Sequence, residues 1–232
     1  MESGSWKEYD FVKDNTFPHD GFAITAGATH FYIIGGSSSS NPQKTVYKSV
    51  DGYNWEKLSW ELYKEIYNGY ACITTNDQSG HENLVVFGKY WKSNERAILL
   101  YDLGTLNPAT DNFELLSNGF GFSTTDTTHQ LVCHAGWVHV ATFDGELHSF
   151  KLSSLSEPGP PKWYTSSYQD TSLGGRLIIY DDKATIVGGA DTNFANQKKL
   201  FYFDPSKGTL VEGPEFPWYK EVDENLVPVV TK

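Results

Sequence analysis

Apolar residues fall into short runs along the chain, separated by stretches rich in Gly, Ser, Asn and Asp. The runs are about four to eight residues long and are rich in Val, Ile, Tyr, Phe and Trp, which is typical of β-strands. Turn sequences such as Asp51-Gly52 stand between them and are strong hairpin signals. The pattern therefore predicts an all-β chain of many short antiparallel strands.

The strand pattern repeats four times, in units of about 20–60, 68–117, 128–167 and 174–215. Each unit divides into four strands separated by turns or polar loops. The expected strands are 21–28, 30–35, 45–49 and 55–60, then 70–76, 83–87, 97–102 and 113–117, then 130–134, 137–143, 146–152 and 163–167, and finally 176–181, 183–187, 200–204 and 209–213. Such repetition indicates modules that bury their apolar faces against one another.

Three features recur within the units. An apolar strand ends in a glycine pair, a later strand ends in an aromatic residue followed by Asp, and a tryptophan comes after it. The residues concerned are Gly35-Gly36 and Gly188-Gly189, then Tyr101-Asp102 and Phe203-Asp204, then Trp55 and Trp163. We expect the glycines where positive φ or close approach of a neighbouring sheet excludes a side chain. We expect the tryptophans to fill the space between sheets.

These features resemble kelch repeats over roughly residues 20 to 215. The equivalent points Gly36, Gly88, Asp144 and Gly189 are separated by 52, 56 and 45 residues, near the roughly 50 of a kelch blade. The third unit departs from the pattern because it has no glycine pair. The resemblance implies a small β-propeller, with four blades of four antiparallel strands in a single domain, 1–232.

The two ends of the chain, 6–12 and 226–230, lie outside the four units and look like strands. We expect them to pair and close the ring, which would remove exposed sheet edges. A five-bladed ring is the alternative, and a fragment of a longer propeller comes third. The segment 49–55 also resembles the Asp-box turn of sialidases, which is a structural hairpin, so it too indicates a propeller blade.

Charge and composition narrow the possible partners and location. The formal net charge is −11 and no basic cluster interrupts it, which argues against nucleic acid. No apolar run is long enough to span a membrane, and the first residues lack the pattern of a signal peptide, so we expect a cytoplasmic protein without membrane contact. Cys72 and Cys133 are too few for a disulfide scaffold, and we expect buried thiols.

In a propeller, the loops from strand two to three and from strand four to the next blade gather around one mouth of the channel. Here those loops are aromatic and polar. Aromatic rings beside amides and carboxylates suit sugar recognition, because rings stack on C–H faces while polar groups bind hydroxyls. Local packing over the strand ends is the alternative. The candidate ligand-binding residues are Trp91, Phe194, Tyr90, Asn193, Asp191, Tyr67, Tyr168, Asp170, His129 and Trp218.

Catalytic and metal signatures are sparse in the sequence. It contains no Gly-x-Ser-x-Gly elbow and no zinc signature, so we expect strand histidines that are solvated or hydrogen-bonded, and neither a metal nor a cofactor. The expected function is a noncatalytic binding module for a protein segment or a carbohydrate, as a monomer or homodimer. No BTB or F-box domain is attached, which argues against a ubiquitin-adaptor role. The alternative is a small-molecule or sugar-processing enzyme using channel carboxylates such as Asp126, Asp170 or Asp191.

Overall fold

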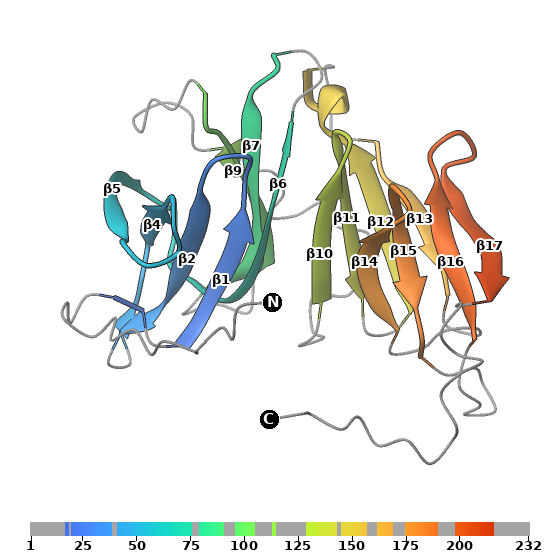
Figure 1. Ribbon diagram of the computed structural model, residues 1–232, viewed down its shortest axis with the longest axis horizontal. Coiled ribbons are helices and arrows are strands. Elements are labelled where there is room, and N and C mark those ends of the chain that lie inside the picture. The colour runs from blue at the N-terminus through green and yellow to red at the C-terminus, as the bar shows by residue number, and fades with distance from the viewer. Residues whose placement is uncertain are drawn as a thin grey trace, which may run out of the picture. The chain divides into compact units, whose positions relative to one another are not determined.

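The computed structural model describes residues 17–18, 20–38, 41–75, 79–90, 96–104, 113–114, 129–142, 145–156, 162–168, 175–189 and 198–215. Within these ranges the chain forms β-strands joined by turns and one 3₁₀ helix, η1 (Leu152–Ser156). The strands build four antiparallel sheets, and in each sheet four strands follow one another in chain order (Figure 1). The all-β prediction is confirmed.

The chain divides into two compact units, residues 1–125 and 126–232, each with two sheets. In the first unit, sheet A contains β1 (Asp20–Ala26), β2 (Phe31–Ser38), β4 (Thr45–Ser49) and β5 (Glu56–Glu61), with β3 (Asn41–Pro42) paired to β2, and sheet B contains β6 (Ile66–Thr75), β7 (Glu82–Tyr90), β8 (Arg96–Asp102) and β9 (Phe113–Glu114). In the second unit, sheet C contains β10 (His129–His134), β11 (Trp137–Thr142), β12 (Glu146–Lys151) and β13 (Tyr164–Ser167), and sheet D contains β14 (Arg176–Tyr180), β15 (Lys183–Val187), β16 (Lys199–Asp204) and β17 (Thr209–Glu215).

Every strand expected within the four units overlaps an observed strand, and the expected 45–49 coincides with β4. The short β3 and the helix η1 were not expected. The largest shift is at β6, which begins at Ile66 rather than at residue 70. Asn68, with φ of 50°, and Gly69 form a bulge inside this strand, whereas the sequence had suggested a turn before it.

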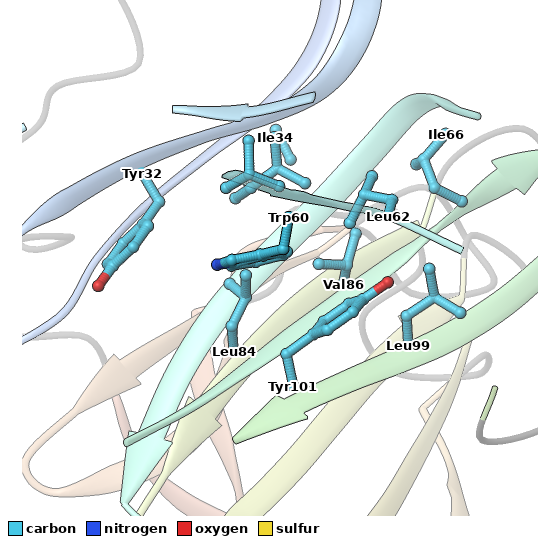
Figure 2. Close-up of a cluster of buried hydrophobic side chains, with 11 residues drawn as sticks. Tyr32, Ile34, Trp60, Leu62, Ile66, Leu84, Val86, Leu99 and Tyr101 are labelled. Atoms are coloured by element: carbon cyan, nitrogen blue, oxygen red, sulfur yellow. The ribbon is translucent and has the colours of Figure 1, made fainter. Parts of the chain in front are cut away.

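The core of the first unit is built from side chains of both its sheets (Figure 2). Alternate residues of each strand point into it, as the period of two requires. Trp60 of β5 stacks on Tyr101 of β8, with ring centroids 5.2 Å apart. Buried members of this core are Ala23, Tyr32, Ile34, Val46, Trp60, Leu62, Ile66, Leu84, Val86, Leu99 and Tyr101.

Trp60 thus fills the space between sheets A and B for which the sequence had suggested Trp55. The indole of Trp55 instead donates a hydrogen bond to the carbonyl of Gly52, 3.1 Å away, within its own turn. That turn is the expected structural hairpin. Asp51 organises it, because its carboxylate accepts hydrogen bonds from the backbone N–H groups of Tyr53 and Asn54, both at 2.8 Å.

The glycine pair, which lies inside β2, meets both requirements inferred from the sequence. Gly35 and Gly36 have φ of 63° and 86°, a region that residues with a side chain rarely adopt. A Cβ on Gly35 would also lie 2.6 Å from the carbonyl oxygen of Ile66 in sheet B. Glycine at this position therefore lets the two sheets approach closely.

The core of the second unit joins sheets C and D in the same way. Its buried members are Ala141, Leu147, Tyr168, Leu177, Ala184, Ile186, Phe201 and Phe203. His139 of β11 is buried beside it, with its ring 6.2 Å from that of Trp137 and 5.1 Å from that of Phe203. Burial, assisted by the nearby His134, lowers the pKa of His139 to about 3, so this imidazole is neutral at physiological pH.

The outer edges of sheets A and D carry charge. In sheet A the edge strand β5 forms ion pairs with β4, Lys48 to Glu56 at 3.5 Å, and within itself, Lys57 to Glu61 at 3.9 Å. In sheet D the edge strand β17 contains Glu212, which pairs with Lys199 of β16. Surface pairs of this kind contribute little to stability, but they keep both edges polar.

Both cysteines of the chain are disulfide-bonded, so the expectation of buried thiols is wrong. The expectation treated two cysteines as too few because disulfide scaffolds use several, but a cysteine can be oxidised without belonging to a scaffold. Disulfides persist mainly in oxidising compartments, and this finding counts against the expected cytoplasmic location, which stays a prediction.

Some expectations concern parts of the chain outside the described residues. The terminal strands 6–12 and 226–230 belong to them. Closure of a ring, the number of blades and the single domain 1–232 therefore stay predictions. Within the ranges given above, no helix is long and apolar enough to cross a membrane.

Candidate functional site

The strands of each sheet run alternately in opposite directions. The first and third strands therefore begin, and the second and fourth strands end, at the same end of the sheet. We call this the loop end, because it carries the connection from strand two to three and the link from strand four onward. The candidate ligand-binding residues were chosen from these connections. In the first unit the described loop ends include Asp20 at the start of β1, residues 62–65 between β5 and β6, and Tyr67 near the start of β6.

Only part of the candidate set can be placed. Trp91, Asp170, Asp191, Asn193, Phe194 and Trp218 lie outside the described residues, as does Asp126 of the enzymatic alternative. Tyr90 is the last residue of β7 and pairs with Ile66, so it stands at the loop end of sheet B. His129 is the first residue of β10 and pairs with Thr142, so it stands at the loop end of sheet C. Their ligand contacts stay predictions.

Tyr67 bridges the loop ends of sheets A and B. A Cβ on Gly21 of β1 would lie 2.3 Å from Cε2 of the Tyr67 ring, so the ring lies directly over this glycine. Gly21 also has φ of 61°, which independently favours glycine. The contact fixes the orientation of Tyr67, whose side chain is half-buried at the end of the first unit.

Tyr168 follows β13 and is buried in the core of the second unit. Its hydroxyl donates a hydrogen bond to the carbonyl oxygen of Thr142, 2.6 Å away. Its backbone N–H donates to the carbonyl of Gly145 at the same distance. This side chain therefore packs across the loop end of sheet C, as the local-packing alternative describes.

Tyr63 is an exposed aromatic residue at the loop end that sequence reasoning missed. It lies between β5 and β6, and 47% of the side chain is exposed. Its backbone is held on both sides: the N–H donates to the hydroxyl of Tyr101 at 3.1 Å, and the carbonyl accepts from Nζ of Lys44 at 3.2 Å. The sequence analysis had placed candidate residues in the link from the fourth strand of one sheet to the first strand of the next. From the link between β5 and β6 it selected Tyr67 and not Tyr63.

One charged group approaches the Tyr63 ring, and further polar groups lie near this residue in the chain or on its backbone. Nζ of Lys64 lies 5.6 Å from the ring centroid, at the outer limit of a cation–π contact. Lys44 is fixed by its bond to the Tyr63 carbonyl, and Asn68 is exposed at the β6 bulge. We call the set of Tyr63, Tyr67, Lys44, Lys64 and Asn68 the tyrosine platform. It can stack on a flat apolar surface and hydrogen-bond to polar groups at its rim.

The described strand histidines are hydrogen-bonded, as expected. His139 pairs with Ser149 and His148 with Thr165, at 2.8 and 3.0 Å. Among the residues that the structure describes, no three His, Cys, Asp or Glu side chains come together to hold a metal ion.

Comparisons with known proteins do not assign the chain to a family. The chain matches no protein-family model, and no curated protein matches it. The kelch resemblance therefore depends on the residues that carry it, and it stays a prediction.

Proposed function

We propose that the chain is a binding module that presents an aromatic and polar loop face to a carbohydrate or a protein segment. The observation that carries the proposal is Tyr63, whose backbone is fixed by Tyr101 and Lys44 while nearly half of its side chain is in solvent. Because the backbone of Tyr63 is already held, only its side-chain torsions lose conformational entropy when a ligand stacks on the ring.

Tyr67 supports the same function. Its ring is seated on Gly21, which limits the rotamers it can adopt. Two tyrosines four positions apart, one with a held backbone and one with a seated ring, with Lys64 and Asn68 beside them in the chain, match the needs of sugar recognition, in which rings stack on C–H faces and polar groups bind hydroxyls. A protein segment with an exposed aromatic or proline side chain has the same requirements.

We further propose that the four sheets are blades of a kelch-like propeller, as a monomer or homodimer. The four-stranded order of each sheet and the close approach at Gly35 support this architecture. In such a ring the loop ends share one face, which would bring Trp91, Phe194 and Trp218 to the same mouth as the tyrosine platform. The function itself is inferred from the platform and not from the architecture, because one fold hosts many functions.

A glycan array and a peptide array, probed with the full chain, test the proposal. We expect one array to give a ligand, with Tyr63→Ala and Tyr67→Ala each weakening its affinity about two- to tenfold, the range of a lost aromatic contact. Tyr53→Ala is the matched control. Tyr53 is 54% exposed, but it lies in the turn between β4 and β5, at the opposite end of sheet A.

The outcomes separate clearly. Equal affinities for the wild type and both platform variants would remove the platform from the site. A loss in Tyr53→Ala as large as in Tyr63→Ala would show that the effect is general and not local. Thermal unfolding of each variant checks that the fold is intact before affinities are compared.

A further inference from the structure

Sheet C carries two imidazole–hydroxyl pairs on neighbouring strands. His139 of β11 lies opposite Ser149 of β12, with Nδ1 2.8 Å from the serine Oγ. His148 of β12 lies opposite Thr165 of β13, with Nδ1 3.0 Å from the threonine Oγ1. The two pairs share β12 and have similar distances. They can therefore be compared by their exposure to solvent and by the groups next to each imidazole.

The His139–Ser149 pair is closed to solvent. His139 is 3% exposed and Ser149 is fully buried, so no substrate can reach the hydroxyl. The pair satisfies two polar groups inside the protein. It provides an internal control for the second pair.

The His148–Thr165 pair has a carboxylate next to its imidazole and solvent next to its hydroxyl. Nε2 of His148 lies 3.0 Å from Oε2 of Glu146, but the two atoms are not aligned for a hydrogen bond, and the imidazole is buried. The negative charge of this carboxylate favours the tautomer that carries hydrogen on Nε2, which leaves Nδ1 with a lone pair to accept the hydroxyl proton of Thr165. Thr165 itself is exposed.

We propose that Thr165 is a nucleophile for acyl transfer, with His148 as its general base and Glu146 as the residue that positions the imidazole. A hydroxyl, an imidazole and a carboxylate in this order are what activates an alcohol at neutral pH. The proposal does not depend on the tyrosine platform, which belongs to the other unit.

The proposed reaction starts from an ester. Oγ1 of Thr165 attacks the acyl carbon while its proton passes to Nδ1 of His148. The bond between the acyl carbon and the alcohol oxygen breaks, and the alcohol leaves with the proton from His148. Water then hydrolyses the acyl-threonine, returns the hydroxyl to Thr165 and releases a carboxylic acid.

The surroundings favour an ester with an apolar acyl group. Trp163 is two residues before Thr165, on the same side of the extended chain, and packs edge-on near His148 with ring centroids 6.5 Å apart. Phe150 backs the Trp163 ring at 4.7 Å. β13 is the edge strand of sheet C, and alternate N–H groups of an edge strand point away from the sheet, where they can stabilise a developing oxyanion.

Incubation of the full chain with p-nitrophenyl butyrate tests the proposal. We expect release of p-nitrophenolate and a butyryl group on Thr165, located by peptide mass mapping. Thr165→Ser should keep the label and Thr165→Val should lose it, and both should fold because the position is exposed. His148→Gln should slow labelling by about 10²-fold or more.

Two further variants test the assigned roles. Ser149→Ala should label like the wild type, because its hydroxyl is buried. Glu146→Gln should slow labelling and Glu146→Asp should restore part of the rate, which loss of packing alone would not produce. Butyryl groups found only on lysines, or labelling of Thr165 at the same rate in wild type and His148→Gln, would overturn the proposal.

Discussion

The side chain of Gln130 on β10 binds the backbone of Leu177 on β14, across the two sheets of the second unit. Its Oε1 accepts the Leu177 N–H at 2.7 Å, and its Nε2 donates to the carbonyl of Gly175 at 3.0 Å. We expect Gln130→Ala to lower the free energy of unfolding by about 1–3 kcal/mol, because it leaves two part-buried backbone groups without partners. Urea unfolding with an unchanged m-value measures this loss.

Gln43 supplies the control for that measurement. Its amide makes one exposed bond to the nearby carbonyl of Asn41, at 3.2 Å. Gln43→Ala should change the free energy of unfolding by less than about 0.5 kcal/mol. A similar loss in Gln130→Ala and Gln43→Ala would mean that the hydrogen bonds of Gln130 between sheets C and D add no more to the free energy of unfolding than an exposed bond does.

The buried His139 predicts a loss of stability in acid. Its pKa is about 3 when folded and 6.5 in the unfolded chain, so the unfolded state binds the proton first as pH falls. The contribution of the neutral His139 to the free energy of unfolding is complete above about pH 6.5 and is lost as pH falls toward 3. We expect the free energy of unfolding to fall by about 2 kcal/mol between about pH 7.5 and pH 5. Urea unfolding across this range should show a flatter profile for His139→Gln than for the wild type. Parallel profiles for wild type and His139→Gln would contradict the assignment.

Two glycines separate backbone strain from crowding. Gly35 has positive φ and lies against the Ile66 carbonyl, whereas Gly52 has φ of 76° and nothing within 4 Å of an added Cβ. Gly52→Ala should cost about 1 kcal/mol, for φ alone. Gly35→Ala should cost about 3 kcal/mol, because crowding is added. Thermal unfolding compares the two, and equal costs would mean that sheets A and B do not approach closely at Gly35.

The state of the cysteines can be read from a thiol count. Protein purified without reductant and unfolded in guanidinium should give no reaction with a thiol reagent, and two thiols per chain after reduction, because the sequence has two cysteines and neither is free. Chains alkylated during cell lysis provide the second arm. Two reactive thiols before reduction would contradict the disulfide and favour a reducing compartment.

The strands could be predicted from the sequence because local pattern and final structure agree in most of them. The segment 45–49 combines β-branched and aromatic residues with a turn signal directly after it, and it forms β4 without an error at either end. The start of β6 was predicted four residues too late, because Asn68 and Gly69 are typical of turns and of bulges alike. Only pairing with β7 across the bulge decides between the two, and that pairing is not local in sequence.

The candidate site was harder to predict because exposure depends on distant contacts. Tyr63 and Tyr168 both follow the last strand of a sheet, yet Tyr63 is exposed and Tyr168 is buried against the Thr142 carbonyl. Glu146 and His148 share a face by simple alternation. Their meeting with Thr165 depends on the register between β12 and β13, which the intervening residues set and no short motif encodes.

The ion pairs along β5 have a consequence beyond the single molecule. A strand at the rim of a sheet offers unpaired backbone groups to any other chain in extended form, and a second copy is the commonest such chain at high concentration. Lys57 and Glu61 place both signs of charge on that rim. If the β5 strand of a second copy paired with it, most registers would bring like charges together or remove charged groups from water. The same few side chains that add almost nothing to folding therefore help the protein to avoid fibrous aggregation while it is crowded or newly made.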